Sequence, residues 1–174
     1  VISRRALLAL LSCLPLAARA QTMTPVGTFD WRYLADTVMG GVSDGQARTD
    51  GGAVRLTGTV STANNGGFIQ VRTDLPDGVP DGATALRLRV RGNGERYFIH
   101  LRTRATRLPW QYYQAGFETS GDWQDVTLPL SDFRPSGGML PRQITPARIR
   151  SLGLVAYGRD HEADVSLAAL GWVT

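Results

Sequence analysis

Apolar and polar residues alternate with a period of two along much of this chain. In Ala83–Arg91, aliphatic residues alternate with Arg87, Arg89 and Arg91. Such alternation places neighbouring side chains on opposite faces of a strand, one buried and one solvated. Similar patterns predict further strands at Gln46–Thr49, Ala53–Val60, Gly67–Thr73, Arg96–Thr103, Trp110–Glu118, Trp123–Leu128, Ile149–Tyr157 and Val165–Trp172.

Segments rich in glycine, proline, aspartate and asparagine separate the predicted strands. Asp50-Gly51-Gly52, between two of them, is a good hairpin turn. The one helical turn that we expect covers Thr145–Arg150, with Thr145 as N-cap and Pro146 at the first helical position. About nine short strands, with no internal repeat or linker, predict a single all-β domain, a β-sandwich of jelly-roll type.

Residues 1–20 have the features of a signal peptide. Arg4 and Arg5 precede the apolar stretch Ala6–Leu16, and Ala18-Arg19-Ala20 resembles a cleavage site. The apolar stretch is well short of the ~20 residues that a membrane-spanning helix needs. We therefore expect a cleaved leader at 1–20, a single mature domain at 21–174 without a transmembrane helix, and a periplasmic or secreted location.

The export route stays open at this point. Ser3–Leu8 resembles a twin-arginine signal, but the general secretory route accepts two arginines equally well. Leu10–Cys13 faintly resembles a lipoprotein cleavage box, which would leave a very short apolar region. Lipidation is therefore the less favoured alternative.

Charge and cysteine content exclude several classes of function. The chain has 19 basic and 15 acidic residues, and the leader holds three of the arginines and no acid, so the remainder has a formal net charge of only +1. A nearly neutral domain is not typical of a nucleic-acid-binding protein. The single cysteine, Cys13, lies in the leader, so the mature chain has no disulfide, thiolate metal site or cysteine nucleophile.

The sequence offers little catalytic chemistry. His100 and His161 are the only histidines, and none of the common nucleophile, phosphate-loop or dinucleotide motifs occurs. His161 in Gly158–Glu162 and the lone carboxylate of Glu118 are weak candidates for a metal site and for glycoside hydrolysis. We expect no enzyme, no cofactor and no metal, although a structural calcium at one of Asp30, Asp36 or Asp44 stays open.

Two glycine-containing segments and one aromatic segment are more informative. Asp36–Gly45 holds three closely spaced glycines, and Asn64-Asn65-Gly66-Gly67 leads into an apolar stretch. In Trp110–Phe117, aromatic residues occupy both faces of the predicted strand, with Trp110 and Gln114 on the same face. Aromatic rings beside amide groups suit sugar rings, whereas the plainer interpretation is that the rings fill the sandwich.

Arginines suggest a second, weaker surface. Arg87 and Arg89 lie on one face of their strand, and Arg102 lies on the face that Phe98 and His100 share. If these faces coincide, the sheet carries a basic stripe that suits an acidic saccharide, a phosphate or an acidic patch of a partner. The alternative is an ordinary solvated outer face.

Several of these segments together resemble the complex I intermediate-associated protein 30 family. The firmest stretches are Asp36–Ser43, Gly66–Val71, Tyr113–Phe117, Trp123–Phe133 and Ile149–Gly153. The resemblance implies a galactose-binding-domain-like jelly roll without established catalytic chemistry. It also implies a role in assembling respiratory complex I, which eukaryotic members of the family assist on the matrix side of the mitochondrial inner membrane.

In a bacterium, the compartment equivalent to the mitochondrial matrix is the cytoplasm. An export signal would therefore send this chain to the side of the membrane opposite to the one on which the family's assembly role takes place. We therefore expect an exported binding protein that acts on a protein partner, either a respiratory-complex or an envelope subunit, or alternatively a carbohydrate-binding module of the bacterial envelope. The candidate binding residues are Met39, Gly40, Gly41, Asn64, Asn65, Trp110 and Gln114, with Arg87, Arg89 and Arg102 as a basic face.

Overall fold

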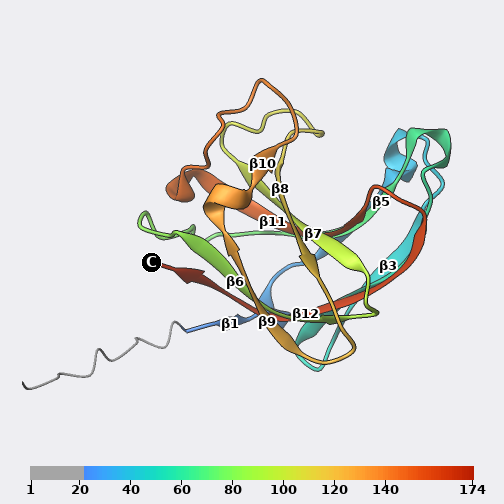
Figure 1. Ribbon diagram of the computed structural model, residues 1–174, viewed down its shortest axis with the longest axis horizontal. Coiled ribbons are helices and arrows are strands. Elements are labelled where there is room, and N and C mark those ends of the chain that lie inside the picture. The colour runs from blue at the N-terminus through green and yellow to red at the C-terminus, as the bar shows by residue number, and fades with distance from the viewer. Residues whose placement is uncertain (1–21) are drawn as a thin grey trace, which may run out of the picture.

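The computed structural model describes residues 22–174, which form two antiparallel sheets packed face to face (Figure 1). The predicted leader at 1–20 lies outside the described residues. In sheet 1 the strand order is β3 (Asp44–Asp50), β4 (Ala53–Val60), β12 (His161–Val173), β6 (Ala85–Gly92) and β9 (Gln124–Pro129), and β1 (Thr24–Pro25) also pairs with β12. In sheet 2 the order is β10 (Arg134–Pro135), β8 (Tyr113–Glu118), β7 (Arg96–Thr103), β11 (Ile149–Tyr157), β5 (Phe68–Asp74) and β2 (Arg32–Ala35).

Short 3₁₀ turns are the only helices within residues 22–174, and none is long and apolar enough to cross a membrane. They are η1 (Val26–Thr28), η2 (Asp36–Met39), η3 (Ala63–Asn65), η4 (Leu130–Asp132) and η5 (Pro146–Arg148). η5 confirms the predicted helical turn, because Thr145 occupies its N-cap and Pro146 its first position. The all-β jelly-roll fold is likewise confirmed.

The apolar positions of the alternating patterns form the core between the sheets. Sheet 1 contributes Leu56, Leu88 and Val165, and sheet 2 contributes Ile99 and Leu154, all fully buried. Because alternate side chains point inward, the intervening residues of each strand form the outer faces of the sandwich. The outer face of sheet 2 is the one that loops border on both sides (Figure 1).

Most strand predictions match within a few residues, and two differ in an informative way. β8 begins at Tyr113 rather than Trp110, because residues 106–111 form a compact loop that the buried Gln111 side chain stabilises by accepting two backbone N–H bonds. β12 begins at His161 rather than Val165, because His161 and Glu162 already pair with β4. The last two residues of the segment Gly158–Glu162 therefore belong to this strand.

Two groups of loops stand above the ends of the sheet 2 strands. One group, on the right in Figure 1, contains η2 and η3. The other group, coloured yellow to orange, consists of residues 104–112 and 136–148. These two lobes frame the outer face of sheet 2.

Candidate functional site

Asp36 joins the two glycine-containing segments. Its side chain is fully buried, and its carboxylate accepts four hydrogen bonds. Oδ1 accepts the backbone N–H of Ser43 at 3.0 Å, and Oδ2 accepts the Ser43 hydroxyl at 2.5 Å. Oδ2 also accepts the backbone N–H groups of Gly67 and Phe68, at 2.5 and 3.1 Å.

These hydrogen bonds decide the charge of the carboxyl group. Burial alone would raise the pKa of Asp36, but the bonds from Ser43, Gly67 and Phe68 outweigh burial and hold that pKa below its usual value. The group is therefore a carboxylate at neutral pH. Since protein donors already occupy its oxygens, this arrangement argues against a calcium ion at Asp36.

Gly41 and Gly66 lie directly against this carboxylate. A Cβ atom at either position would overlap the Asp36 carboxyl group, so glycine is what allows the two segments to close around it. The resulting η2–η3 lobe carries five of the predicted binding residues, Met39, Gly40, Gly41, Asn64 and Asn65. At its tip the side chains of Val38 and Met39 are 73% and 61% exposed.

Trp110 and Gln114 lie away from the η2–η3 lobe. Trp110 is 59% exposed in the loop before β8, and Gln114 lies within β8, opposite His100. The strand registers place the η3 end of β5 and the Trp110 end of β8 about five residues apart along the sheet, which corresponds to roughly 15–20 Å. The structure therefore divides the predicted binding residues between the two ends of sheet 2.

Four aromatic side chains form a row on the outer face of sheet 2. Tyr112 stacks on His100 with a centroid distance of 3.8 Å and an interplanar angle of 7°. Tyr157 meets His100 edge-on at 5.9 Å and Phe98 edge-on at 6.0 Å. The row runs from the end of the Trp110 loop to the end of β11, and Tyr157 is its most exposed ring, at 36%.

His100 holds the row together as a neutral ring. Only 8% of the residue is exposed, and burial lowers the pKa of His100 to about 4 although its hydrogen bond to Gln114 opposes that shift. The neutral ring therefore donates Nε2–H to Gln114 Oε1 at 2.8 Å. Burial and a hydrogen bond with Tyr157 raise the pKa of Tyr112, so Tyr112 keeps its hydroxyl proton at neutral pH.

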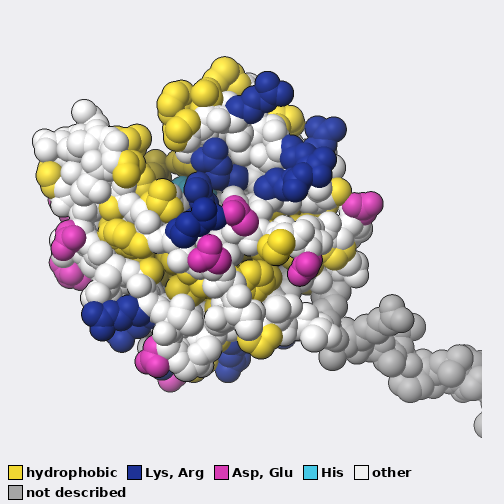
Figure 2. Space-filling model, turned by 180° about the vertical axis from the view of Figure 1, so that it is seen from behind, with side chains coloured by type: hydrophobic (Ala, Val, Ile, Leu, Met, Phe, Trp, Pro, Cys, Tyr) yellow, Lys and Arg dark blue, Asp and Glu magenta, His cyan; other side chains and the backbone are white. Residues whose placement is uncertain are grey.

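Amide and guanidinium groups lie beside the aromatic row. The register places Gly153 between His100 and Arg72, and the Gln70 side chain extends over this glycine, with Oε1 3.1 Å from the position of a Cβ. Figure 2 shows that the molecular surface is hollowed between two lobes, with arginine side chains beside the hollow. Flat rings next to neutral and charged hydrogen-bond donors are the groups with which proteins bind hydroxylated rings.

The arginines predicted as one basic face lie on opposite sides of the sandwich. Arg87 and Arg89 project from the outer face of sheet 1, and both form ion pairs with Asp125, at 2.8 and 3.1 Å. Arg102 projects from the outer face of sheet 2, where it donates to carbonyl groups of the loop 106–109. The single basic stripe does not form, because β6 and β7 belong to different sheets.

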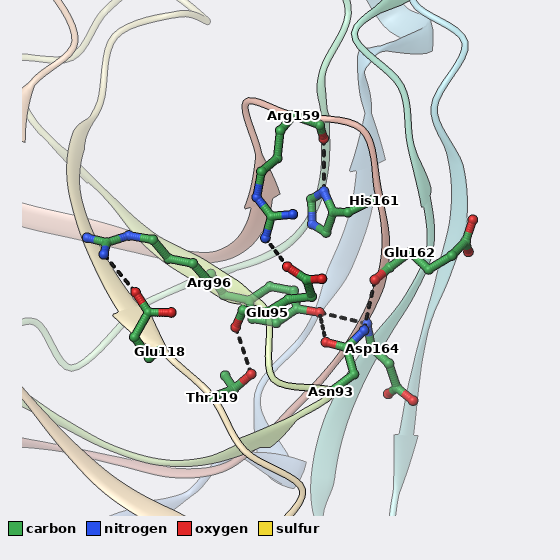
Figure 3. Close-up of polar contacts among 10 residues, drawn as sticks. Asn93, Glu95, Arg96, Glu118, Thr119, Arg159, His161, Glu162 and Asp164 are labelled. Carbon is green, nitrogen blue, oxygen red and sulfur yellow. Dashed lines mark hydrogen bonds and ion pairs between the residues drawn. The ribbon is translucent and has the colours of Figure 1, made fainter.

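The weak metal candidate around His161 has other partners (Figure 3). His161 Nδ1 bonds to the carbonyl of Arg159 at 2.8 Å. The Glu162 carboxylate accepts the Thr59 hydroxyl at 2.8 Å, while its backbone carbonyl accepts the Asn93 amide. Over residues 22–174 no three His, Cys, Asp or Glu side chains gather in a way that could hold a metal ion.

Glu118, the weak candidate for hydrolysis, is an exposed end-of-strand residue. Its carboxylate pairs with Arg96 at 2.8 Å (Figure 3). Glycoside hydrolysis needs a second carboxylate across the scissile bond. The partner of Glu118 is a guanidinium group instead.

Sequence reasoning missed three residues of the outer face of sheet 2, namely Gln70, Arg72 and Tyr157. Alternation within β5 does place Gln70 and Arg72 on the polar face of their strand, whereas β11 is buried on both faces over most of its length and gives no such signal for Tyr157. However, the order of the strands, which brings these faces next to His100, depends on contacts between distant segments. The same holds for Asp36, whose burial no local pattern indicates.

Comparison with known proteins gives one family and one fold. The family model described as complex I intermediate-associated protein 30 matches residues 21–168. A search of the curated proteins gave no significant match.

Similar solved structures include carbohydrate-binding modules and larger proteins that contain a similar domain. A family 11 carbohydrate-binding module from Clostridium thermocellum, in complex with a β-1,3-1,4-mixed-linked tetrasaccharide, has a TM-score of 0.68 and 14% identity over 88% of this chain and 95% of that one. A family 30 carbohydrate-binding module has a TM-score of 0.55 and 16% identity, over 85% and 83%. An agarase has a TM-score of 0.57 and 13% identity, over 88% of this chain and 25% of the agarase. At these identities the likeness is one of fold.

Proposed function

The chain belongs to the complex I intermediate-associated protein 30 family, and we propose that it is an exported, non-catalytic binding protein whose ligand is a saccharide. The observation that carries this proposal is the row of Tyr112, His100, Tyr157 and Phe98 on the outer face of sheet 2. The predicted leader places this activity in the periplasm or outside the cell.

The chemistry of the face supports a sugar ligand. Sugar rings present flat patches of C–H groups, which pack on aromatic rings, and hydroxyl groups, which need donors and acceptors at their edges. Tyr157 offers an exposed ring, and the amides of Gln70 and Gln114 flank the row. Because these side chains project from paired strands, the face is preformed and little ordering entropy is lost on binding.

A glycan array probed with the purified protein tests the proposal. We expect specific glycans to bind, and the Tyr157→Ala variant to lose that binding while it keeps the thermal stability of the parent. Trp123→Ala is the matched control, because Trp123 lies under Arg91 on the opposite side of the sandwich. Absence of binding to neutral and acidic glycans alike, or equal loss in both variants, would refute a saccharide site on sheet 2.

A second candidate function is binding of a protein partner at the tip of the η2–η3 lobe. Val38, Met39 and Val42 are all exposed there, and exposed aliphatic residues in a cluster are typical of interaction surfaces. The Asp36 hydrogen bonds hold this tip in one conformation. Crosslinking from the cell envelope with the parent and with Met39→Asp tests it, since a specific partner should be lost from the variant alone.

A further inference from the structure

Arg72 is a cationic group without a partner beside the aromatic row. It forms neither a hydrogen bond nor an ion pair within the described part of the chain, and its Nε–H is buried without an acceptor. A buried, unpaired donor on a charged group is costly unless a ligand or ordered water satisfies it. Among the arginines on this face, Arg32 pairs with Asp74 and Arg96 with Glu118.

The neighbouring charges make the same position attractive to an anion. Arg102, a second cation on this face, donates only to neutral carbonyl groups of the 106–109 loop, so no carboxylate offsets its charge. Burial, and the nearby charge of Arg72, lower the pKa of Arg102. Since Arg32 and Asp74 cancel each other, Arg72 and Arg102 leave two uncompensated positive charges beside the aromatic row.

The amide of Gln70 lies on the same face as the guanidinium group. Gly153 lies between Arg72 and His100 in the register, and it contributes no side chain to the outer face. A saccharide that packs on Tyr157 would therefore have the amide of Gln70 and the guanidinium group of Arg72 along its edge. The planar guanidinium group matches a planar carboxylate, to which it can donate two parallel hydrogen bonds.

We propose that the saccharide bound by this face is acidic, and that the carboxylate of a uronic acid residue binds Arg72. This inference rests on the proposed saccharide function, and it adds the chemical class of the ligand. Arg102 attracts the carboxylate through its positive charge at longer range, because its N–H donors already bond to carbonyl groups of the loop.

Isothermal titration calorimetry of the full protein tests the inference. The probes are tetrasaccharides of galacturonate, mannuronate and glucuronate, each paired with its neutral methyl ester. We expect at least one uronate to bind, and its methyl ester to bind at least about tenfold more weakly, because the ester loses a charge-assisted hydrogen bond. The affinity for the uronate should fall as salt is added, since salt screens exposed charges.

Two substitutions assign the effect to Arg72. Arg72→Gln should lower the affinity for the uronate about tenfold or more while leaving weak binding of the ester unchanged. Arg72→Lys keeps the positive charge but lacks the paired N–H donors of the guanidinium group. Its affinity for the uronate should therefore lie between those of the parent and of Arg72→Gln. Arg87→Gln, on the far side of the sandwich, is the matched control and should have no effect. Melting temperatures identify any variant that loses binding by unfolding.

The outcomes separate the inference from the function on which it rests. Three results would overturn the proposal of an acidic ligand and leave saccharide binding in place. They are equal affinities for acid and ester, binding of neutral glycans only, and full retention of uronate binding by Arg72→Gln. Absence of binding to every glycan on the array and to every tetrasaccharide would overturn both.

Discussion

Replacement of Asp36 by asparagine is expected to lower the free energy of unfolding by about 4–6 kcal/mol. In the best orientation, the asparagine oxygen takes the position of Oδ2 and keeps three acceptor contacts, but these become neutral hydrogen bonds, each weaker by about 1 kcal/mol. The new NH₂ group then faces the Ser43 N–H, and a buried donor left without an acceptor costs about 1–3 kcal/mol. This loss is a large part of the 5–15 kcal/mol that typically stabilises a domain.

Urea denaturation at neutral pH measures the effect. Asp44→Asn is the matched control, because Asp44 is exposed and its carboxylate has no hydrogen bond or ion pair within residues 22–174. We expect a shift in the urea midpoint for Asp36→Asn without a change in slope, and almost no shift for the control. A loss below about 1 kcal/mol for Asp36→Asn, well under the sum of these contributions, would refute the view that this carboxylate joins the two segments.

Two further predictions concern pH and backbone packing. As the pH falls from 6.5 towards 4, the unfolded chain protonates His100 while the folded chain keeps it neutral, so the free energy of unfolding should decrease by roughly 3 kcal/mol. Urea titrations across this range should show a smaller decrease for His100→Gln, and an unchanged decrease would contradict the prediction. Gly58 has a φ of +152°, and a Cβ atom at this position would overlap the backbone of Asp44 in the paired strand. Gly58→Ala should therefore lower the free energy of unfolding by at least about 2 kcal/mol. Gly138→Ala, where the space is open, should cost much less by the same thermal melts, and similar losses in both variants would count against the packing argument.

The sequence carries most of the information about strands and little about how they meet. The sequence predicted β7 and β11 with their observed bounds, because both are apolar-rich stretches and the turns around them are locally encoded. β2 and β10 escaped prediction since they are short edge strands whose pairing depends on distant partners. The order of strands follows from contacts between segments far apart in the chain, and local patterns do not specify it.

The candidate site shows the same division. The sequence placed His100 and Arg102 on one face, as observed, because that relation needs only the period of a strand. Assigning Arg87 and Arg102 to one surface required the sheets to be known, and these residues face opposite sides of the sandwich. The glycines of Asp36–Gly45 signalled an unusual backbone correctly, whereas their reason, a buried carboxylate shared with Gly67, arises from tertiary packing.

The two candidate binding surfaces depend on different parts of the fold. Three rings of the aromatic row lie on β7 and β11, and Tyr112 directly precedes β8; ladder hydrogen bonds and the core beneath fix the positions of these strands. The exposed tip at Val38 and Met39 lies on a short 3₁₀ turn. The backbone hydrogen bonds of one turn are too few to hold the tip in one conformation. Asp36 supplies that restraint, because it ties η2 to the start of β5 through Gly67 and Phe68. Loss of its charge therefore loosens the tip, and with it one wall of the hollow, while the rings that would pack against a sugar keep their places.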